Sequence, residues 1–162
     1  MKRVMITGSF DPVTVGHEDI IRRAAQTFDD VRVVVFLNPE KAGLFFAEER
    51  VAFLRAVTEK YPNVTVDFDE GYVADYVKRE EISLILRSLR GVSDLSYEMQ
   101  MAKYNLTHGG VETVFLAGDP SLADVSSSEV RRRIAAGEPY FALLPVEIRE
   151  KIEKIIKNRS TK

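Results

Sequence analysis

The sequence predicts an α/β protein with a doubly wound, five-stranded parallel sheet and helices on both faces. Short runs rich in β-branched residues alternate along the 162 residues with segments of helical periodicity. This alternation is typical of parallel strands joined by right-handed crossovers. The run VRVVVFL at 31–37 is also apolar on both faces, as a strand between two helical layers is. Together these observations predict a Rossmann-like architecture.

The strands are predicted at 3–7, 31–37, 63–68, 82–87 and 112–117. Each is a short run rich in Val, Ile, Leu, Phe or Thr, which suits a pleated, buried segment. Because these strands alternate with helical segments, we expect them to pair in parallel.

The helices are predicted at 17–28, 47–61, 72–79, 92–106, 127–136 and 145–158. The first has an apolar stripe formed by Ile20, Ile21, Ala24, Ala25 and Phe28, and the second has one formed by Val51, Leu54, Val57 and Tyr61. Gly137 ends the fifth helix, and Pro145 suits the first turn of the last. With no repeat or flexible linker in the sequence, we expect a single domain over 1–162, closed by a C-terminal helix at about 145–158.

Composition narrows the functional class. Apolar residues make up 45% and charged residues 30% of the chain, which is ordinary for a globular protein. The net charge of −2 gives no electrostatic reason to expect nucleic acid as a partner. The chain has no cysteine, which excludes disulfides and thiol catalysis and fits a reducing compartment. Without a signal-like or membrane-spanning stretch, a cytoplasmic protein that contacts no membrane is expected.

The loop after the first strand, GSFDPVTVGH at 8–17, is the first candidate site. Ligands of doubly wound sheets bind outside the carboxyl ends of the strands. Gly8 and Gly16 allow backbone N–H groups to approach a ligand, and the helix start that follows favours an anion. His17 can donate to a phosphate oxygen there. The alternative is a plain Ser-Phe-Asp-Pro turn in which His17 lies near the helix cap.

The segment VSSSEVR at 125–131 is the second candidate. Three consecutive hydroxyls and the N–H groups of a helix start can hold a polyphosphate. The alternative is a capping box, since Ser126 and Glu129 have the S-x-x-E spacing, and both interpretations can hold together.

Three cations complete the predicted site. Arg87 and Arg90 lie at and just beyond the carboxyl end of an apolar strand, and Lys41 follows the second strand. Guanidinium forks match phosphate geometry, whereas a lysine acts as a point charge. The alternative for the two arginines is an ordinary solvated pair.

The two segments resemble the signatures G-[ST]-F-D-x-x-[HT]-x-G-H and I-S-S-[ST]-x-x-R of the nucleotidyltransferase superfamily, the first in its Thr-x-Gly-His form. LRSLRGVSDLSYEMQMAKYN at 86–105 and NPEKAGLFFAEER at 38–50 resemble the bacterial phosphopantetheine adenylyltransferase family, and the likeness runs from residue 2 to about 155. It implies transfer of the adenylyl group of ATP to 4′-phosphopantetheine, giving 3′-dephospho-coenzyme A and pyrophosphate, by in-line attack without a covalent intermediate. It also implies Mg²⁺ accompanying ATP and a homohexamer.

The resemblance also implies roles for individual residues. The expected catalytic residues are His17, Lys41 and Arg90, with His17 stabilising the α-phosphate as it is attacked. Phosphopantetheine is expected to contact Ser9, Lys41, Val73, Arg87 and Asn105. ATP is expected to contact Ser9, Phe10, His17, Ser88, Leu89, Arg90, Glu98, Leu122, Ala123, Asp124, Val125, Ser126, Ser127 and Ser128. No metal ligand from the protein is implied.

Some positions depart from the family pattern. Ser88 stands where the family has Gly, and Leu122 where an aromatic residue is common, so their contacts with adenine are the least supported of the implied roles. Phe46 replaces the usual Ser or Thr cap before the helix at 47–61, which should cost about 1 kcal/mol of helix stability.

Three other functions are compatible with parts of the sequence. A related enzyme acting on nicotinate mononucleotide or a cytidylyltransferase would share both signatures, but would not require the 86–105 pattern. A non-catalytic module that senses nucleotides or coenzyme A is the third, and the intact set His17, Lys41, Arg87 and Arg90 argues against it.

Overall fold

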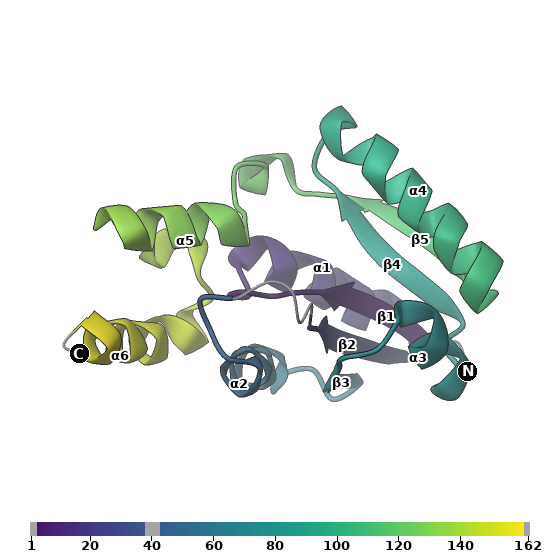
Figure 1. Cartoon of the computed structure of the whole chain (residues 1–162), viewed down its shortest axis with the longest axis horizontal. Coiled ribbons are helices and arrows are strands. Elements are labelled where there is room, and N and C mark those ends of the chain that lie inside the picture. Colours follow the sequence, from purple (N-terminus) through teal and green to yellow (C-terminus); the bar gives the residue numbers. More distant parts are fainter. Residues whose placement is uncertain (1–2, 38–42, 161–162) are drawn as a thin grey trace.

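The strands form one sheet in the computed structural model, which describes residues 3–37 and 43–160 (Figure 1). The strands are β1 (Arg3–Gly8), β2 (Asp30–Phe36), β3 (Val64–Asp69), β4 (Leu84–Leu89) and β5 (Glu112–Ala117). Their order is β3-β2-β1-β4-β5, and every neighbouring pair is parallel. The predicted five-stranded parallel sheet is confirmed.

Six α-helices occur in the described ranges. They are α1 (Val15–Thr27), α2 (Ala47–Thr58), α3 (Val73–Arg79), α4 (Val92–Gly109), α5 (Ser127–Ala136) and α6 (Arg149–Ser160). The 3₁₀ turns are Pro120–Leu122, Phe141–Leu143 and Val146–Ile148. The last turn accounts for the largest boundary error, since the helix predicted from 145 begins at Arg149 after Pro145 and the 3₁₀ turn. Among these described helices, none is long and apolar enough to cross a membrane.

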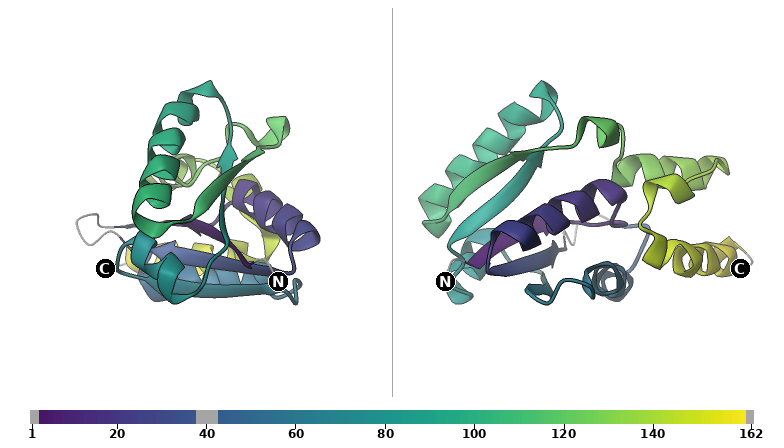
Figure 2. Two further views of the ribbon diagram at one scale, coloured as in Figure 1. Left: turned by 90° about the vertical axis from the view of Figure 1, so that its right-hand side faces the viewer. Right: turned by 180° about the vertical axis from the view of Figure 1, so that it is seen from behind.

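The sheet separates two hydrophobic cores, because alternate side chains of a strand point to opposite faces. Ile6 and Val33 belong to the larger core, which also contains residues of α1, α2 and α6. Met5 and Val34, their neighbours in sequence, belong to the smaller core with Tyr76 of α3. Figure 2 shows α1 and α4 on opposite sides of the strands. Helices therefore cover both faces, as predicted.

The direction of winding reverses beside β1. The chain passes from β1 to β2 and β3 on one side, then returns to place β4 against the other edge of β1. The connections therefore diverge at the carboxyl ends of β1 and β4, which is where such folds bind ligands.

The start of α2 departs from an ordinary cap, as the sequence predicted. Phe46 provides no side-chain hydrogen bond to the first turn. The Glu49 carboxylate instead accepts from the Phe46 N–H, with 2.8 Å between N and Oε2. One half of a capping box is therefore present.

Candidate active site

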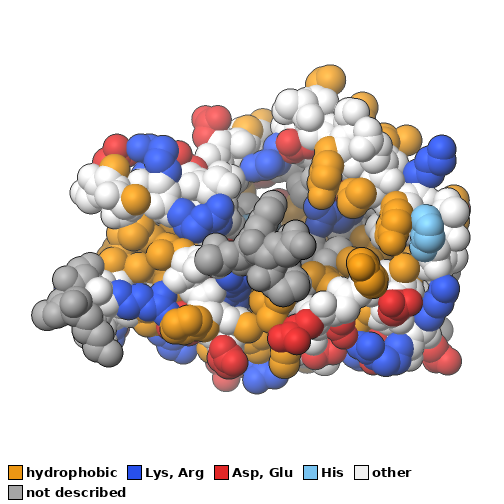
Figure 3. Space-filling view, viewed as in Figure 1, with side chains coloured by type: hydrophobic (Ala, Val, Ile, Leu, Met, Phe, Trp, Pro, Cys, Tyr) orange, Lys and Arg blue, Asp and Glu red, His pale blue; other side chains and the backbone are white. Residues whose placement is uncertain are grey.

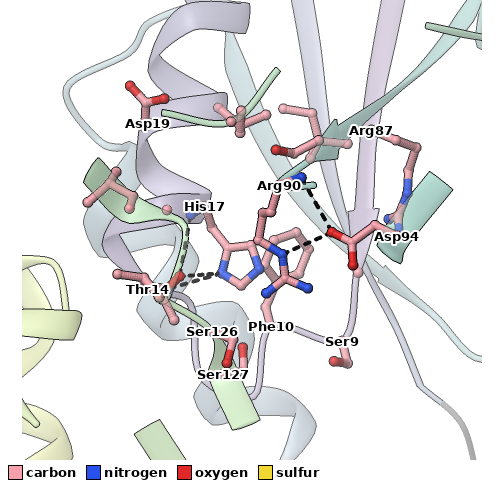
Figure 4. Close-up of a pocket in the computed structure, with 18 of the residues that line it drawn as sticks. Ser9, Phe10, Thr14, His17, Asp19, Arg87, Arg90, Asp94, Ser126 and Ser127 are labelled. Carbon is pink, nitrogen blue, oxygen red and sulfur yellow. Dashed lines mark hydrogen bonds and ion pairs between the residues drawn. The ribbon is translucent and has the colours of Figure 1, made fainter. Parts of the chain in front are cut away.

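The carboxyl ends of β1 and β4 border a cavity of about 530 Å³ (Figure 4). Its lining comes from four segments far apart in sequence: the loop from β1 into α1, the end of β4 with the start of α4, the turn after β5, and the start of α5. These include three of the loops that the sequence predicted. The fourth follows β2, and its residues 38–42, which include Lys41, lie outside the described residues.

Most of the predicted site residues meet in this cavity. Those that line it are Ser9, Phe10, His17, Arg87, Ser88, Arg90, Glu98, Leu122, Val125, Ser126, Ser127 and Ser128. Leu89, Ala123 and Asp124 belong to the same segments but do not contribute to the lining. Val73 on α3 and Asn105 on α4 also lie outside the lining, and their roles stay predictions.

His17 is held by the cap of α1. The Thr14 N–H donates to His17 Nδ1 at 3.0 Å, and the His17 N–H donates to Thr14 Oγ1 at 3.4 Å. This is a capping box in which histidine replaces the usual glutamate. Because Nδ1 accepts, the neutral ring carries its proton on Nε2. The near-cap alternative and the site interpretation of His17 are thus compatible.

The imidazole of His17 is neutral at physiological pH. Burial and, to a smaller extent, the charges of Arg87 and Arg90 lower the pKa of His17 to about 4. A neutral Nε2–H can donate a hydrogen bond without giving up its proton. This suits stabilisation of charge on a phosphate better than general acid catalysis near pH 7.

Phe10 supports the histidine ring. Its backbone adopts φ 44, an uncommon conformation for a residue with a side chain. The ring packs edge-on against His17, with 5.0 Å between the centroids, and is only 2% exposed. The predicted contact of Phe10 with ATP therefore has little exposed ring surface available to it.

The start of α5 is tied to the loop after β1. Ser126 caps the helix by accepting from the Glu129 N–H at 3.1 Å, whereas Ser127 Oγ donates to the carbonyl of Pro12 at 2.7 Å. A hydroxyl has one proton to donate, so in this arrangement Ser127 offers a phosphate its backbone N–H rather than its hydroxyl proton.

The capping box proposed at this helix is half correct. Glu129 does not return a hydrogen bond to Ser126; its carboxylate pairs with Arg132 and Arg133, at 2.8 and 2.7 Å. These guanidinium groups lower the pKa of Glu129 to about 2. Two nearby cations outcompete a single backbone N–H for the carboxylate.

The Arg87 guanidinium is fixed by a bidentate ion pair with Glu98. Its Nε and Nη2 donate to the two carboxylate oxygens of Glu98 at 2.8 and 2.7 Å, and Nη1 donates to the carbonyl of Thr7. Glu98 is 7% exposed and comes from α4. The residue predicted to contact ATP thus holds a predicted phosphate-binding arginine.

Arg90 pairs with Asp94 at longer distances than Arg87 does with Glu98. Its Nε lies 3.2 Å from Asp94 Oδ2, and its backbone N–H donates to the same oxygen at 3.3 Å (Figure 4). The Arg90 side chain is 47% exposed. The guanidinium is therefore accessible from the cavity while resting against a carboxylate.

Several lining residues were missing from the sequence prediction. Thr14, Asp94 and Arg131 all line the cavity. Thr14 and Arg131 belong to the two quoted signatures, so their signal was present although no role was assigned to them. Asp94 is four residues after Arg90, a spacing informative only within one helix, and here the pair spans a strand end and a helix start.

Comparison with known proteins assigns the class. Residues 5–133 match the family described as cytidylyltransferase-like, and the chain belongs to this family. The crystal structure of the lipopolysaccharide core biosynthesis protein from Thermoplasma volcanium GSS1 has a TM-score of 0.53 and 21% identity, covering 74% of this chain and 97% of that one. That likeness shows a shared fold alone.

Relatives over nearly the whole length narrow the class to the phosphopantetheine adenylyltransferases. One from Thermobifida fusca is 43% identical over 152 residues, which are 94% of this chain and 93% of that protein. One from Streptomyces coelicolor is 42% identical over 98% of this chain and the whole of that protein. One from Clostridium novyi is 42% identical, again over 98% and 100%.

Proposed function

We propose that this chain transfers the adenylyl group of ATP to 4′-phosphopantetheine, giving 3′-dephospho-coenzyme A and pyrophosphate. The observation that carries the proposal is His17, a neutral donor with its proton on Nε2, in a cavity that also contains Arg87 and Arg90. The relatives named phosphopantetheine adenylyltransferase support this choice of substrates.

The proposed chemistry is one in-line displacement. An oxygen of the phosphopantetheine phosphate attacks the α-phosphorus of ATP, and the bond from that phosphorus to the oxygen bridging to the β-phosphate breaks. The attacking phosphate is already anionic near pH 7, so no general base is required. His17 Nε2–H stabilises the negative charge on the α-phosphate oxygens, and the rest of the catalysis comes from positioning.

The cations divide between the two substrates in this proposal. Arg87, with Lys41 and Ser9, binds the phosphate of phosphopantetheine, while Val73 and Asn105 lie along its pantetheine arm. Arg90 and the backbone at the start of α5 bind the β- and γ-phosphates of ATP, as guanidinium groups and helix N-termini do.

Mg²⁺ is proposed to arrive with ATP as part of the substrate. Within the described ranges, no three acidic or histidine side chains gather as a metal cage would require. We therefore expect phosphate oxygens and water to provide most of its ligands, as is common for Mg²⁺ with nucleotides. It would neutralise the departing pyrophosphate. We further expect the reaction to take place in the cytoplasm.

We also propose that the chain forms a homohexamer, and the exposed apolar surface of α4 supports this proposal. Hydrophobic side chains gather over this helix in Figure 3. Val92, Tyr97 and Met99 are 87%, 60% and 53% exposed. A patch of this kind marks an interaction surface. Light scattering after size-exclusion chromatography should give six times the mass of 18.3 kDa, and a monomer would contradict the proposal.

Pyrophosphate release tests the reaction directly. With ATP, release should require 4′-phosphopantetheine and yield dephospho-coenzyme A by mass spectrometry. Turnover only with nicotinate mononucleotide, or only with CTP, would indicate one of the related enzymes. Binding of ATP without any release would favour a sensing module.

A further inference from the structure

Two charged residues of the recognised segments have no assigned role, and they meet inside the protein. Asp11 belongs to the loop after β1, and Arg50 lies on α2. Asp11 is 5% and Arg50 7% exposed, and Arg50 Nε lies 3.4 Å from Asp11 Oδ1. Neither residue lines the cavity, so any effect on catalysis must pass through their neighbours.

The carboxylate of Asp11 accepts hydrogen bonds from the backbone of the segment that leads into α2. Oδ2 accepts from the Leu44 N–H and Oδ1 from the Phe45 N–H, both at 2.9 Å. Each oxygen thus holds one backbone donor. The loop after β1 is fastened in this way to residues more than thirty positions later.

The guanidinium of Arg50 completes the link in the opposite direction. Its Nε donates to the carbonyl of Phe45 at 2.8 Å, and its Nη1 donates to the carbonyl of Ser9 at 3.3 Å. Arg50 therefore contacts the backbone of the residue before Phe10, and Asp11 is the residue after it. Phe10 is the residue with φ 44 whose ring packs against His17.

A third segment is attached to the same point. Arg131 Nη1 donates to the backbone carbonyl of Asp11 at 2.6 Å, and its Nη2 lies 3.2 Å from Ser128 Oγ. The start of α5 is thereby held against the loop that carries Ser9. Residues from three regions are fixed around one buried carboxylate.

We propose that Asp11 and Arg50 are a positioning pair for adenylyl transfer. A buried ion pair adds little net stability compared with apolar residues of the same size, whereas its hydrogen bonds fix the geometry of the groups that it joins. Here the joined groups are Ser9, Phe10 and, through the Phe10 ring, His17. The pair should therefore act on the rate of the chemical step. This inference rests on the proposed function.

Arg50→Lys is the first test, because it keeps the charge but cannot make both carbonyl contacts. We expect kcat to fall about 10- to 100-fold, the scale of a reacting group misplaced by about an ångström. The KM values for ATP and phosphopantetheine should stay within about threefold. The matched control is Leu54→Ala, fully buried on the same helix. It should lower the melting temperature without lowering kcat.

Gly43→Ala is the second test and leaves both charged residues in place. A Cβ on Gly43 would lie 1.6 Å from Arg50 Nη2 and 3.0 Å from Asp11 Oδ2, so the guanidinium must move. The same loss of kcat is expected in this variant. Folded variants with wild-type kcat, a rise in KM alone, or an equal loss of kcat in Leu54→Ala would each overturn the proposal. Wild-type pyrophosphate release in the same assay shows separately whether the proposed reaction holds.

Discussion

The two walls of the cavity are built on different principles. The wall from the β1 loop and the start of α5 carries neutral donors whose other hydrogen bonds are made within the protein, such as His17 on Thr14 and Ser127 on the Pro12 carbonyl, beside the single guanidinium of Arg131. The wall from β4 and α4 carries guanidinium groups, each resting on a carboxylate.

This difference separates two tasks. A fixed neutral donor gains most where charge develops during the reaction, because it needs no rearrangement at that moment. A paired guanidinium binds charge that the substrates already carry, and a phosphate must share or displace its carboxylate. Loss of the neutral donor His17 should therefore lower kcat, and changes to the paired guanidinium groups Arg87 and Arg90 should alter KM.

The largest effect is expected from His17→Ala. Loss of the Nε2–H donor should lower kcat by about 10²–10³ with KM changed only a few-fold, since one preorganised donor contributes on that scale. Steady-state pyrophosphate release measures both constants, and thermal unfolding checks the fold. An unchanged kcat would remove His17 from the mechanism and abolish the contrast between the walls.

Arg87→Ala should show the opposite pattern. We expect the KM for phosphopantetheine to rise about 10- to 100-fold, the strength of a charged hydrogen bond, with a smaller change in kcat. Because the variant leaves Glu98 buried and unpaired, it should also be destabilised. The control is the double variant with Glu98→Gln, which should recover stability but not KM. Recovery of both would make Arg87 a structural residue.

The pH dependence of stability tests whether His17 is neutral in the folded chain. The pKa of His17 is about 4 in the folded chain and 6.5 as the ordinary value, so the unfolded chain binds the proton more readily. Stability should therefore fall as pH drops through 6.5 towards 4, by on the order of 2 kcal/mol between pH 7 and 5 from this group. Chemical denaturation of the wild type and of His17→Asn at pH 7 and pH 5 measures the loss of stability in each protein. Parallel losses in both proteins would contradict the low pKa.

Asp94→Asn should produce the smallest effect. Removing the carboxylate releases Arg90 from an exposed ion pair worth under about 1 kcal/mol. The KM for ATP should fall about two- to threefold, and the difference should shrink at high salt. A higher KM would show instead that Asp94 positions Arg90, as Glu98 does for Arg87.

The sequence predicted the sheet and the edge where the cavity lies, because the alternation of strand and helix patterns along the chain is enough to indicate both. It could not predict the partners of the arginines. The pairing of Arg87 with Glu98 depends on how α4 packs beside β4, and that of Asp11 with Arg50 on how α2 meets the loop after β1. Glu129 shows a third case, in which local spacing indicated a capping box but neighbouring arginines bind the carboxylate more strongly.

The bonds from Ser127 to Pro12 and from Arg131 to Asp11 join residues more than a hundred positions apart. During synthesis, the first signature loop must wait until residue 131 has left the ribosome before these partners are available. A truncated chain ending before α5 would retain His17 and both β4 arginines yet lack the contacts that hold the β1 loop to α5. Appearance of activity during translation would therefore report that the chain has been synthesised through α5.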